Sequence, residues 1–523
     1  MLKTIFVYYL LIGVLILKKV NGRYELYGNP ITKAQSRAAD GWKTMLAKKF
    51  SYNPNEKYSL STKPNPFLGD VFGLMDILRG DSGNPFNPKD AVVISTIRMG
   101  FGHYRIAMAG VSAAKAMGFT PYWLDLLAIP GITTDVINWC NTNYSHFSRI
   151  SQRSTLFNKY VWECLSTGNP TLPGLNAIFN KWIVTWPWRF IKTEVKDYKM
   201  SELFMNLYSA LPSDTPILTS HMWNCMGAIA GGMTNVVDMM FDNWPMAFQL
   251  TEGAKHAVQS PSGYYGFRTM RGFDEKNKIM KPVPADSLFF TGHHVDHELV
   301  ENIEVDCAAR LNRMKNREPR RFLVTMGGAG AQKELFKAII DHSITLIKKK
   351  KVSLFINLGD HKANWEWLEK ELADNKDLVH THFIWQETKD FADTIREGSV
   401  EGLHVFLFDN TFHAVYATNY LMRVVDVMVT KPSELAFYPV PKIFNARVGG
   451  HEMWGAIRGA EIGDSTVETR TVAETLQAID LITEDTDLLT LFCECIIKNK
   501  QTGIYDGAYK SVELATGKKW ERK

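Results

Sequence analysis

The chain has 523 residues, of which 45% are hydrophobic and 22% are charged, and its formal net charge at pH 7 is +5. This length exceeds what one hydrophobic core supports, so we expect two α/β domains with extensions. Such a small net charge is too mild to argue for nucleic acid, and no basic run with interleaved aromatic residues is present, so we expect no nucleic-acid partner.

The six cysteines are scattered along the chain, and Cys493 and Cys495 form the only close pair. No matching His or Cys cluster accompanies that pair to complete a zinc site. We therefore interpret the cysteines as reduced core thiols, which are typical of a cytosol-facing protein.

Residues 1–22 contain an apolar run at 4–17, which lies between Lys3 and Lys18. The run is shorter than the roughly 20 residues of a spanning helix, so a signal peptide, an anchor and a helix in the membrane interface are all open. Basic residues directly follow the run and favour keeping the rest of the chain on the cytoplasmic side. We expect a single N-terminal anchor that associates the protein with the cytoplasmic face of a membrane, with a cleaved signal peptide as the alternative.

Residues 23–88 are polar and rich in Pro-containing turns, which predicts an N-terminal extension with a helix or two. The periodic pattern begins at Ala91, where an apolar strand runs into a Gly-containing turn. An Ala-rich helix follows and ends at Gly118, before a second strand, so this segment is one β-turn-α-β unit. Further strands are expected at 215–221, 235–241 and 286–292.

Residues 131–210 are aromatic-rich and mostly helical in pattern. Buried helices are the commoner location of aromatic side chains. The alternative is a surface that dips into lipid, where Trp and Tyr are favourable. In both cases the segment belongs to an N-terminal domain that we place at residues 89–311.

A charged stretch at 312–321 separates the first half from a second block that begins with a strand. That strand leads into a Gly-rich turn and a helix, and further strands are expected at 352–359, 403–408, 424–430 and 441–446. We place the second domain at 312–490 and a helical, basic tail at 491–523. Because strands alternate with helices in both halves, we predict an α/β fold of two doubly wound, Rossmann-like parallel sheets that face each other across a cleft.

Residues 427–452 are the most informative stretch, because an apolar strand ends at Lys431 and a proline, Ser433 and Glu434 follow. Turns at strand ends can present backbone N–H groups to phosphates, and a nearby carboxylate can accept hydrogen bonds from ribose. Ser433 is a plausible N-cap of a short helix, and Glu434 is the ribose candidate. The alternative is an ordinary capped helix, in which Glu434 only favours the helix dipole.

A series of motifs follows one order between residues 90 and 480. They are STIRMGFGH with Gly100, Gly102 and His103; Thr219-Ser220-His221; FDNW with Asp242 and Trp244; FFTGHHV with Gly292; MGGAG with Gly327, Gly328 and Gly330; VVDVMVTK with Asp426 and Lys431; and GGHEMWGA with Gly450 and Glu452. With these motifs the chain resembles the GT-B glycosyltransferases, and within them the branch that contains MurG and the galactosyl- and glucosyl-diacylglycerol synthases. The first loop is Gly-Phe-Gly instead of Gly-Gly-Gly and the segment after Lys431 is short, so the identity of the donor stays open.

The resemblance implies that His103, at the start of the first helix, is the general base. A neutral imidazole can take a proton from an acceptor hydroxyl near neutral pH. His221 could serve instead or bind the acceptor, and Asp242 could orient whichever histidine acts. The alternative for His103 is a side chain that only caps the loop.

The resemblance also implies a nucleotide-sugar site. Gly-rich turns let the backbone approach a diphosphate, a lysine pairs with phosphate, and Glu452 holds sugar hydroxyls. The candidates are Gly100, Gly102, Gly327, Gly328, Gly330, Lys431, Ser433, Glu434, Gly450 and Glu452. A plain tight turn, a solvated lysine at a strand end and a glutamate in a surface loop are the alternatives.

Two other motifs compete with this interpretation. The turn at Gly100, with Asp125 about 20 residues further on, resembles a dinucleotide-binding fingerprint, but Arg105 stands where the third glycine belongs. Asp485-Thr-Asp487 is the one Asp-x-Asp candidate for a metal, and we interpret it as surface charge in an acidic helical region. We therefore expect no cofactor and no essential metal.

Together these features predict an inverting, metal-independent hexosyltransferase. It would move a sugar from a nucleotide-diphosphate donor, with UDP-sugar favoured, to a hydroxyl of a lipid or glycan acceptor at a membrane surface, and residues 131–210 would lie on the acceptor side. One alternative is a sugar-nucleotide 2-epimerase of the same fold, which needs carboxylates for proton transfer at the sugar. Another is a non-catalytic nucleotide-binding protein with a GT-B-like fold.

Overall fold

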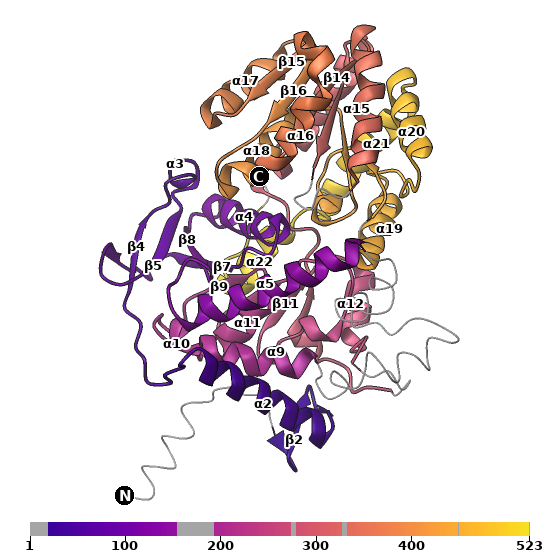
Figure 1. Ribbon diagram of the computed structural model, residues 1–523. Helices are drawn as coiled ribbons and strands as arrows, with labels where there is room; N and C mark the ends of the chain where they lie inside the picture. The colour runs from indigo at the N-terminus through magenta and orange to yellow at the C-terminus, as the bar shows by residue number, and fades with distance from the viewer. Residues whose placement is uncertain (1–18, 154–192, 274–278, 327–331, 448, 522–523) are drawn as a thin grey trace, which may run out of the picture.

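The computed structural model describes residues 19–153, 193–273, 279–326, 332–447 and 449–521. They form two α/β lobes, which lie one above the other in Figure 1. α13 (His297–Glu301) and α14 (Ile303–Lys315) connect the last strand of the lower, N-terminal lobe to the first strand of the upper, C-terminal lobe.

The lower lobe is built on one mostly parallel sheet. Its described strands are β4 (Leu60–Pro64), β5 (Met75–Arg79), β6 (Asn84–Pro85), β7 (Ala91–Thr96), β8 (Thr120–Asp125), β9 (Ile217–Thr219), β10 (Val236–Met239), β11 (Lys255–Val258) and β12 (Leu288–Phe290). Their spatial order is β12-β11-β10-β9-β7-β8-β5-β4-β6. β7 pairs in parallel with β8 on one side and β9 on the other, so the chain winds outward in both directions. Both pairings of β4 are antiparallel.

β7 shows why these residues form a central strand. All of its residues are buried, and a parallel strand covered on both faces needs such a continuous apolar run. Successive side chains of a strand point to opposite faces, so Val92 and Ile94 enter a core that continues into the upper lobe, whereas Val93 enters the core on the other face. β7 thereby delivers its carboxyl end to the loop that begins α4 (Phe101–Ala116).

The upper lobe is built on a parallel sheet. Its described strands are β13 (Arg320–Thr325), β14 (Val352–Asn357), β15 (Val379–His382), β16 (Gly402–Phe406), β17 (Val427–Thr430) and β18 (Lys442–Phe444), in the spatial order β15-β16-β14-β13-β17-β18. β13 pairs with β14 on one side and with β17 on the other. The predicted fold class is therefore confirmed: both lobes are doubly wound, and each has a switch of direction beside its first central strand, the usual place for a ligand site.

Helices cover both faces of each sheet (Figure 1). In the lower lobe the remaining elements are β1 (Lys19–Val20), β2 (Arg23–Leu26), β3 (Asn29–Pro30), α2 (Lys33–Lys49), α3 (Gly69–Phe72), α5 (Ile132–Arg153), α9 (Thr193–Ser201), η3 (Glu202–Phe204), α10 (Met205–Tyr208), α11 (Met222–Ala230), η4 (Ala247–Gln249), α12 (Pro261–Arg268) and η5 (Ala285–Ser287). In the upper lobe and the tail they are α15 (Lys333–Lys348), α16 (Lys362–Glu371), η6 (Ala373–Leu378), α17 (Trp385–Glu397), α18 (Thr411–Val424), η7 (Glu434–Phe437), η8 (Gly450–Glu452), α19 (Met453–Ile462), α20 (Val472–Glu484), α21 (Asp487–Gln501) and α22 (Gly507–Thr516).

The sequence prediction missed β11, β15 and the strands that precede Ala91, and it also missed the return of the tail to the lower lobe. β11 and β15 are short, and β15 lies at a sheet edge where two of its four residues are exposed, so neither has a strong apolar pattern. The segment predicted as an extension contributes β4, β5 and β6 to the sheet of the lower lobe. The tail crosses back from the upper lobe, and α22 packs beside α4 in the core between the lobes. The domain boundaries themselves stay a prediction.

The predicted membrane anchor must be corrected. Among the described residues no helix is long and apolar enough to cross a membrane, so a single N-terminal anchor is not supported. The apolar run at 4–17, on which that prediction rested, lies outside the described residues, as do positions 154–192 of the aromatic-rich segment.

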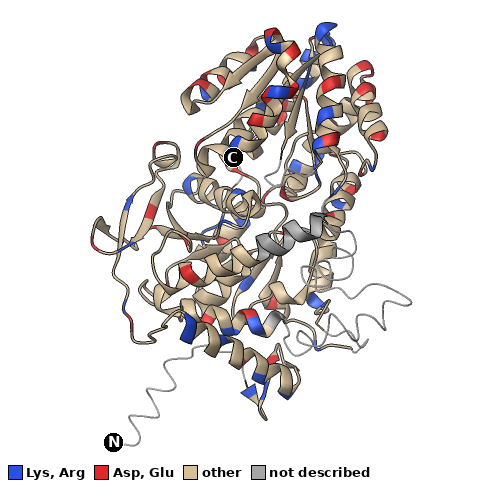
Figure 2. Ribbon diagram, viewed as in Figure 1, with Lys and Arg blue, Asp and Glu red and all other residues tan. Residues whose placement is uncertain are grey.

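The surface charges agree with the small net charge. Figure 2 shows Lys and Arg interspersed with Asp and Glu over both lobes. Asp485 and Asp487 are exposed at the junction of α20 and α21, as expected for surface charge. The described cysteines, which are Cys140, Cys225, Cys307, Cys493 and Cys495, are free thiols, and Cys164 lies outside the described residues.

A buried ion pair connects the helix between the lobes to the sheet of the upper lobe. Asp426, which precedes β17, is fully buried and accepts hydrogen bonds from Nε and Nη2 of Arg313 on α14, at 3.0 and 2.8 Å. Its second oxygen accepts from the backbone N–H of Arg321 at 2.9 Å. This carboxylate therefore holds α14 against β13 and β17.

Replacing Asp426 by alanine should lower the free energy of unfolding by about 3–5 kcal/mol, because it leaves the Arg313 guanidinium buried without its partner. Chemical denaturation of the whole chain measures this loss. The matched control is Asp393→Ala, which removes an exposed ion pair with Arg396 and should cost only about 0–1 kcal/mol. Equal, small effects of both changes would contradict this role of Asp426.

Candidate functional site

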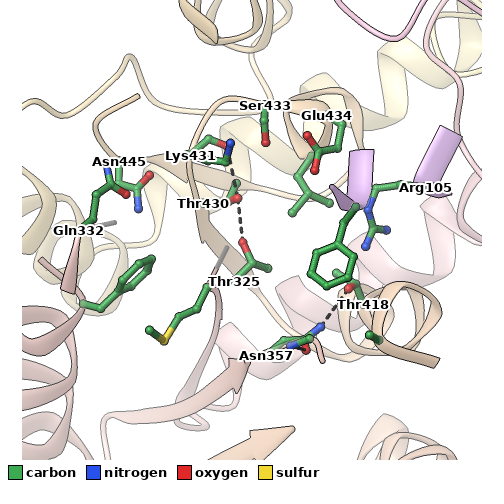
Figure 3. Close-up of a pocket in the computed structure, with 16 residues that line it drawn as sticks. Arg105, Thr325, Gln332, Asn357, Thr418, Thr430, Lys431, Ser433, Glu434 and Asn445 are labelled. Carbon is green, nitrogen blue, oxygen red and sulfur yellow. Dashed lines mark hydrogen bonds between the residues drawn. The ribbon is translucent and has the colours of Figure 1, made fainter. Parts of the chain in front are cut away.

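A pocket of about 170 Å³ lies between the two lobes. From the lower lobe, Phe101 and Arg105 of α4 line it; from the upper lobe, the carboxyl ends of β13, β14, β17 and β18 line it, together with α15, α18 and η7. Figure 3 shows Arg105 and Glu434 on one side of the pocket and Gln332 and Asn445 on the other. The pocket is therefore at the switch point beside β13, with α4 as its opposite wall.

His103 lies in the first turn of α4. Its Nδ1 is 2.7 Å from the backbone oxygen of Ser220, and because a carbonyl only accepts, Nδ1 carries the proton and donates it. Nε2 then keeps its lone pair. Burial lowers the pKa of the imidazole below its ordinary value, and the Ser220 carbonyl and the nearby Glu434 carboxylate offset this only partly. A neutral imidazole in a fixed tautomer is the form that a general base needs.

His221 contacts the His103 ring edge to face, with 4.7 Å between the ring centroids. It is the N-cap of α11, and its Nδ1 accepts a hydrogen bond from the backbone N–H of Trp223 at 3.1 Å. Burial, and then the neighbouring His103, lower the pKa of His221 well below its ordinary value. Its Nδ1 lone pair is thus used in capping, which makes it the weaker candidate base of the two.

Asp242 follows β10 and lies near the upper lobe. Its Oδ1 accepts a hydrogen bond from the backbone N–H of Trp244 at 3.1 Å. Burial raises the pKa of its carboxyl to about 6, and His451 on η8 partly offsets that rise. The contacts of Asp242 that the structure describes are therefore with its own turn and with η8, and its orientation of a histidine stays a prediction.

Gly100 and Gly102, which precede His103, are each required to be glycine by a different feature of the structure. Gly100 has φ of +105°, a left-handed backbone that other residues rarely adopt, and it is the N-cap of α4. At Gly102 a Cβ atom would lie 3.1 Å from Oε2 of Glu434, so the missing side chain lets that carboxylate approach. Glu434 comes from η7 in the upper lobe, and its negative charge faces the positive end of α4.

The loop after β17 contains three further candidates. Ser433 precedes η7, but its hydroxyl makes no capping hydrogen bond, and Figure 3 shows it directed toward the pocket. Lys431 also lines the pocket, and its Nζ is 2.5 Å from Oε1 of Glu452. Glu452 is buried on η8 and accepts a further bond from the backbone N–H of Gly449 at 3.1 Å. Lys431 and Glu452, both predicted to bind the donor, thus pair with each other. Gly450, another candidate, is the first residue of η8.

Three predicted site residues cannot be placed. Gly327, Gly328 and Gly330 lie outside the described residues. In the described part of the chain no group of three or more His, Cys, Asp or Glu side chains could hold a metal ion. The expectation of a metal-independent site stays a prediction.

Sequence reasoning missed Arg105 as a site residue and noted it only as a misfit to a dinucleotide motif. The guanidinium is buried, and it donates to Oδ1 of Asn419 at 3.1 Å and to the backbone oxygen of Val415 at 3.0 Å, both on α18. Its plane also lies over the Tyr438 ring, at 5.3 Å from the centroid. The available signal was an arginine in the middle of a mostly apolar helix. Its partners lie more than 300 positions away in sequence, so the sequence alone could not indicate them.

Comparison with known sequences gives two family matches, both described as domains of unknown function. DUF6937 matches residues 25–269 and DUF6938 matches residues 283–516. No curated protein sequence matches the chain.

Solved structures similar to the chain include the UDP-GlcNAc 2-epimerase from Neisseria meningitidis bound to UDP-GlcNAc, with 10% identity, a TM-score of 0.42, and coverage of 82% of this chain and 100% of that one. WaaG, a glycosyltransferase involved in lipopolysaccharide biosynthesis, has 11% identity, a TM-score of 0.39, and coverage of 82% and 100%. The α,α-trehalose-phosphate synthase (UDP-forming) from Burkholderia vietnamiensis has 10% identity, a TM-score of 0.40, and coverage of 82% and 97%.

The fold is the GT-B arrangement. It is identified by the two doubly wound sheets and the pocket between them. With identities of 10–11% and TM-scores of 0.39–0.42, the structures above support no conclusion about the reaction.

Replacing Arg105 by methionine should lower the free energy of unfolding by about 1–3 kcal/mol, because Asn419 and the Val415 carbonyl lose a buried donor. Since the guanidinium also lines the pocket, the Kd for UDP should rise about tenfold. Chemical denaturation and isothermal titration measure the two effects. The control, Arg37→Met on the exposed side of α2, should change neither. Unchanged stability of the Arg105 variant would contradict the assigned contacts.

Proposed function

We propose that the protein is a glycosyltransferase that moves a sugar from a nucleotide-diphosphate donor, with UDP-sugar favoured, to an acceptor hydroxyl. The observation that carries the proposal is the position of His103 in the first turn of α4, the helix that contributes Phe101 and Arg105 to the pocket, with Nδ1 donating to the Ser220 carbonyl and Nε2 keeping its lone pair. Deprotonation of a hydroxyl that attacks the sugar from the His103 side would invert the configuration of the transferred sugar.

The donor's diphosphate would lie between the end of α4 and the loop after β17. Arg105 lines this region as a fixed cation and Lys431 as a partly exposed one, and the first turn of α4 presents free backbone N–H groups. These groups would stabilise the negative charge that develops on the departing nucleotide, which is the contribution that such a transfer needs most. Glu434 and Glu452 would then hold the ribose and the sugar, as the resemblance implies.

The motif order supports placement beside MurG and the diacylglycerol-linked synthases, whose first helix begins with the same histidine. The departures in the first loop and after Lys431 leave the donor base and the acceptor to experiment.

A sugar-nucleotide 2-epimerase is a second candidate, because the Glu434 carboxylate approaches α4 beside His103 and could act with it in proton transfer at the sugar. Incubation with UDP-GlcNAc alone separates the two. An epimeric product without any acceptor would favour the epimerase, whereas turnover that requires an acceptor favours the transferase.

A thermal-shift screen of UDP, GDP, ADP and TDP sugars tests nucleotide binding directly. A ligand that binds only the folded protein stabilises it by about 2.7 kcal/mol at 100 times its Kd, so at least one of these ligands should raise the melting temperature by several degrees. Because no metal is expected, the shift should persist in EDTA. If no nucleotide sugar moves the midpoint, the proposed function is wrong.

His103→Ala should lower kcat by about 10² to 10⁴-fold and leave the Kd for the nucleotide nearly unchanged, because only proton transfer is lost. His342→Ala, on α15 and paired with Asp480, is the matched control and should keep full turnover. Normal turnover of His103→Ala would show that His103 is not the general base.

The pH dependence of kcat/KM gives a second measurement on the same residue. Burial lowers the pKa of His103, so the base form already dominates at neutral pH and activity falls only as the pH drops through the lowered value. The acid limb should have its midpoint below about 6.5, the ordinary value for histidine, and a midpoint above that value would argue against His103 as the base.

A further inference from the structure

Asn445 is a buried amide without partners. It directly follows β18, none of its surface is exposed, and both Oδ1 and Nδ2 lack a hydrogen-bond partner. Its backbone N–H is held by the carbonyl of Thr430 at 3.0 Å, so the residue is fixed in place. Buried amides are nearly always hydrogen-bonded in proteins, because burying them unpaired is costly. Since both atoms lack partners, this conclusion does not depend on which amide atom is nitrogen.

The unpaired amide lines the pocket between the lobes. Asn357 provides an internal comparison, because it lines the same pocket and both of its amide atoms are satisfied. Its Nδ2 donates to Thr418 at 3.0 Å, and its Oδ1 accepts from the backbone N–H of Gly359 at 2.9 Å. The missing partners of Asn445 are therefore particular to its end of the pocket.

That end of the pocket is lined mainly by neutral amides and hydroxyls, and its cation, Lys431, pairs with Glu452. Figure 3 shows Asn445 and Gln332 on the side away from Arg105 and Glu434, and Thr325 and Thr430 lie below Lys431, with a hydrogen bond of 2.8 Å between their hydroxyls. Phosphate oxygens only accept, so a phosphate would suit Nδ2 and oppose Oδ1. Sugar hydroxyls both donate and accept, and two adjacent hydroxyls match the two atoms of one amide.

The volume of the pocket agrees with one sugar ring. An engineered protein cavity of roughly 150 Å³ holds benzene, and this pocket measures about 170 Å³. It is therefore large enough for one six-membered ring, and the nucleoside of a nucleotide sugar must extend out of it.

We propose that Asn445 is a specificity-determining residue that binds two neighbouring hydroxyls of the donor's sugar, with Oδ1 accepting from one and Nδ2 donating to the other. This inference rests on the proposed function. It assigns the sugar to the β18 end of the pocket, while the charged groups beside α4 and Lys431 take the diphosphate.

Isothermal titration tests the proposal with the whole chain as wild type, Asn445→Ala and Asn445→Asp. Each protein is titrated with UDP, UDP-glucose, UDP-galactose and UDP-GlcNAc. Both variants should bind UDP within twofold of wild type and bind the best UDP-sugar at least tenfold more weakly. Asn364→Ala is the matched control, because its buried Nδ2 also lacks a partner but lies outside the pocket, and it should bind both as wild type does.

The melting temperature without ligand separates this role from a structural one. Removing an unpaired buried amide should leave it unchanged or higher in Asn445→Ala, whereas loss of a structural residue would lower it. Equal weakening of UDP and UDP-sugar, or no weakening of either, would overturn the assignment while the proposed function stands. If wild type binds neither UDP nor a UDP-sugar, the proposed function fails and this assignment fails with it.

Discussion

The contact between α4 and α18 determines the geometry of the whole interface between the lobes. Arg105 is buried in that contact and donates to two acceptors on α18, so α4 cannot slide along the upper lobe without breaking both bonds. His103 precedes Arg105 by two residues on the same helix, and its distance from the ends of β13 and β17 is therefore fixed by the same contact. Arg98 and Asp360 add an ion pair at 2.5 Å across the lobes, and a Cβ at Gly359 would lie 2.8 Å from the Phe101 ring.

The charged groups around the pocket already contact other groups of the protein in this structure. Glu434 faces the first turn of α4, and Glu452 pairs with Lys431. An arriving diphosphate would compete with Glu434 for the end of α4 and with Glu452 for Lys431. On the proposed function, a carboxylate released from either contact becomes available to a sugar or ribose hydroxyl, so donor binding would rearrange the residues that the resemblance assigns to the donor.

The sequence predicted the fold well wherever a strand is a continuous apolar run, as in β7, β13 and β17. It failed for β11 and β15, which are short, and for the return of α22 to the lower lobe, which depends on contacts distant in sequence. Around the site, motif order indicated His103, Gly100, Gly102 and Glu434 as candidates; Glu434 lines the pocket, and the roles of all four stay predictions. Arg105 and Asn445 were not predicted. Arg105 stands out because of its buried contacts with α18, and Asn445 because its buried amide lacks partners. Neither burial nor distant partners can be recognised in a single sequence. The pairing of Lys431 with Glu452 was hidden for the same reason.

The central claim is that a nucleotide sugar binds between the lobes and contacts both. Hydrogen exchange with and without a UDP-sugar, followed by mass spectrometry of peptides, tests it most directly. The account predicts that ligand binding slows hydrogen exchange in three segments together: the first turn of α4, the segment after β17 and the segment after β18. All three should be protected because they surround one ligand. Protection confined to a single lobe, or no protection in any of these segments, would contradict it.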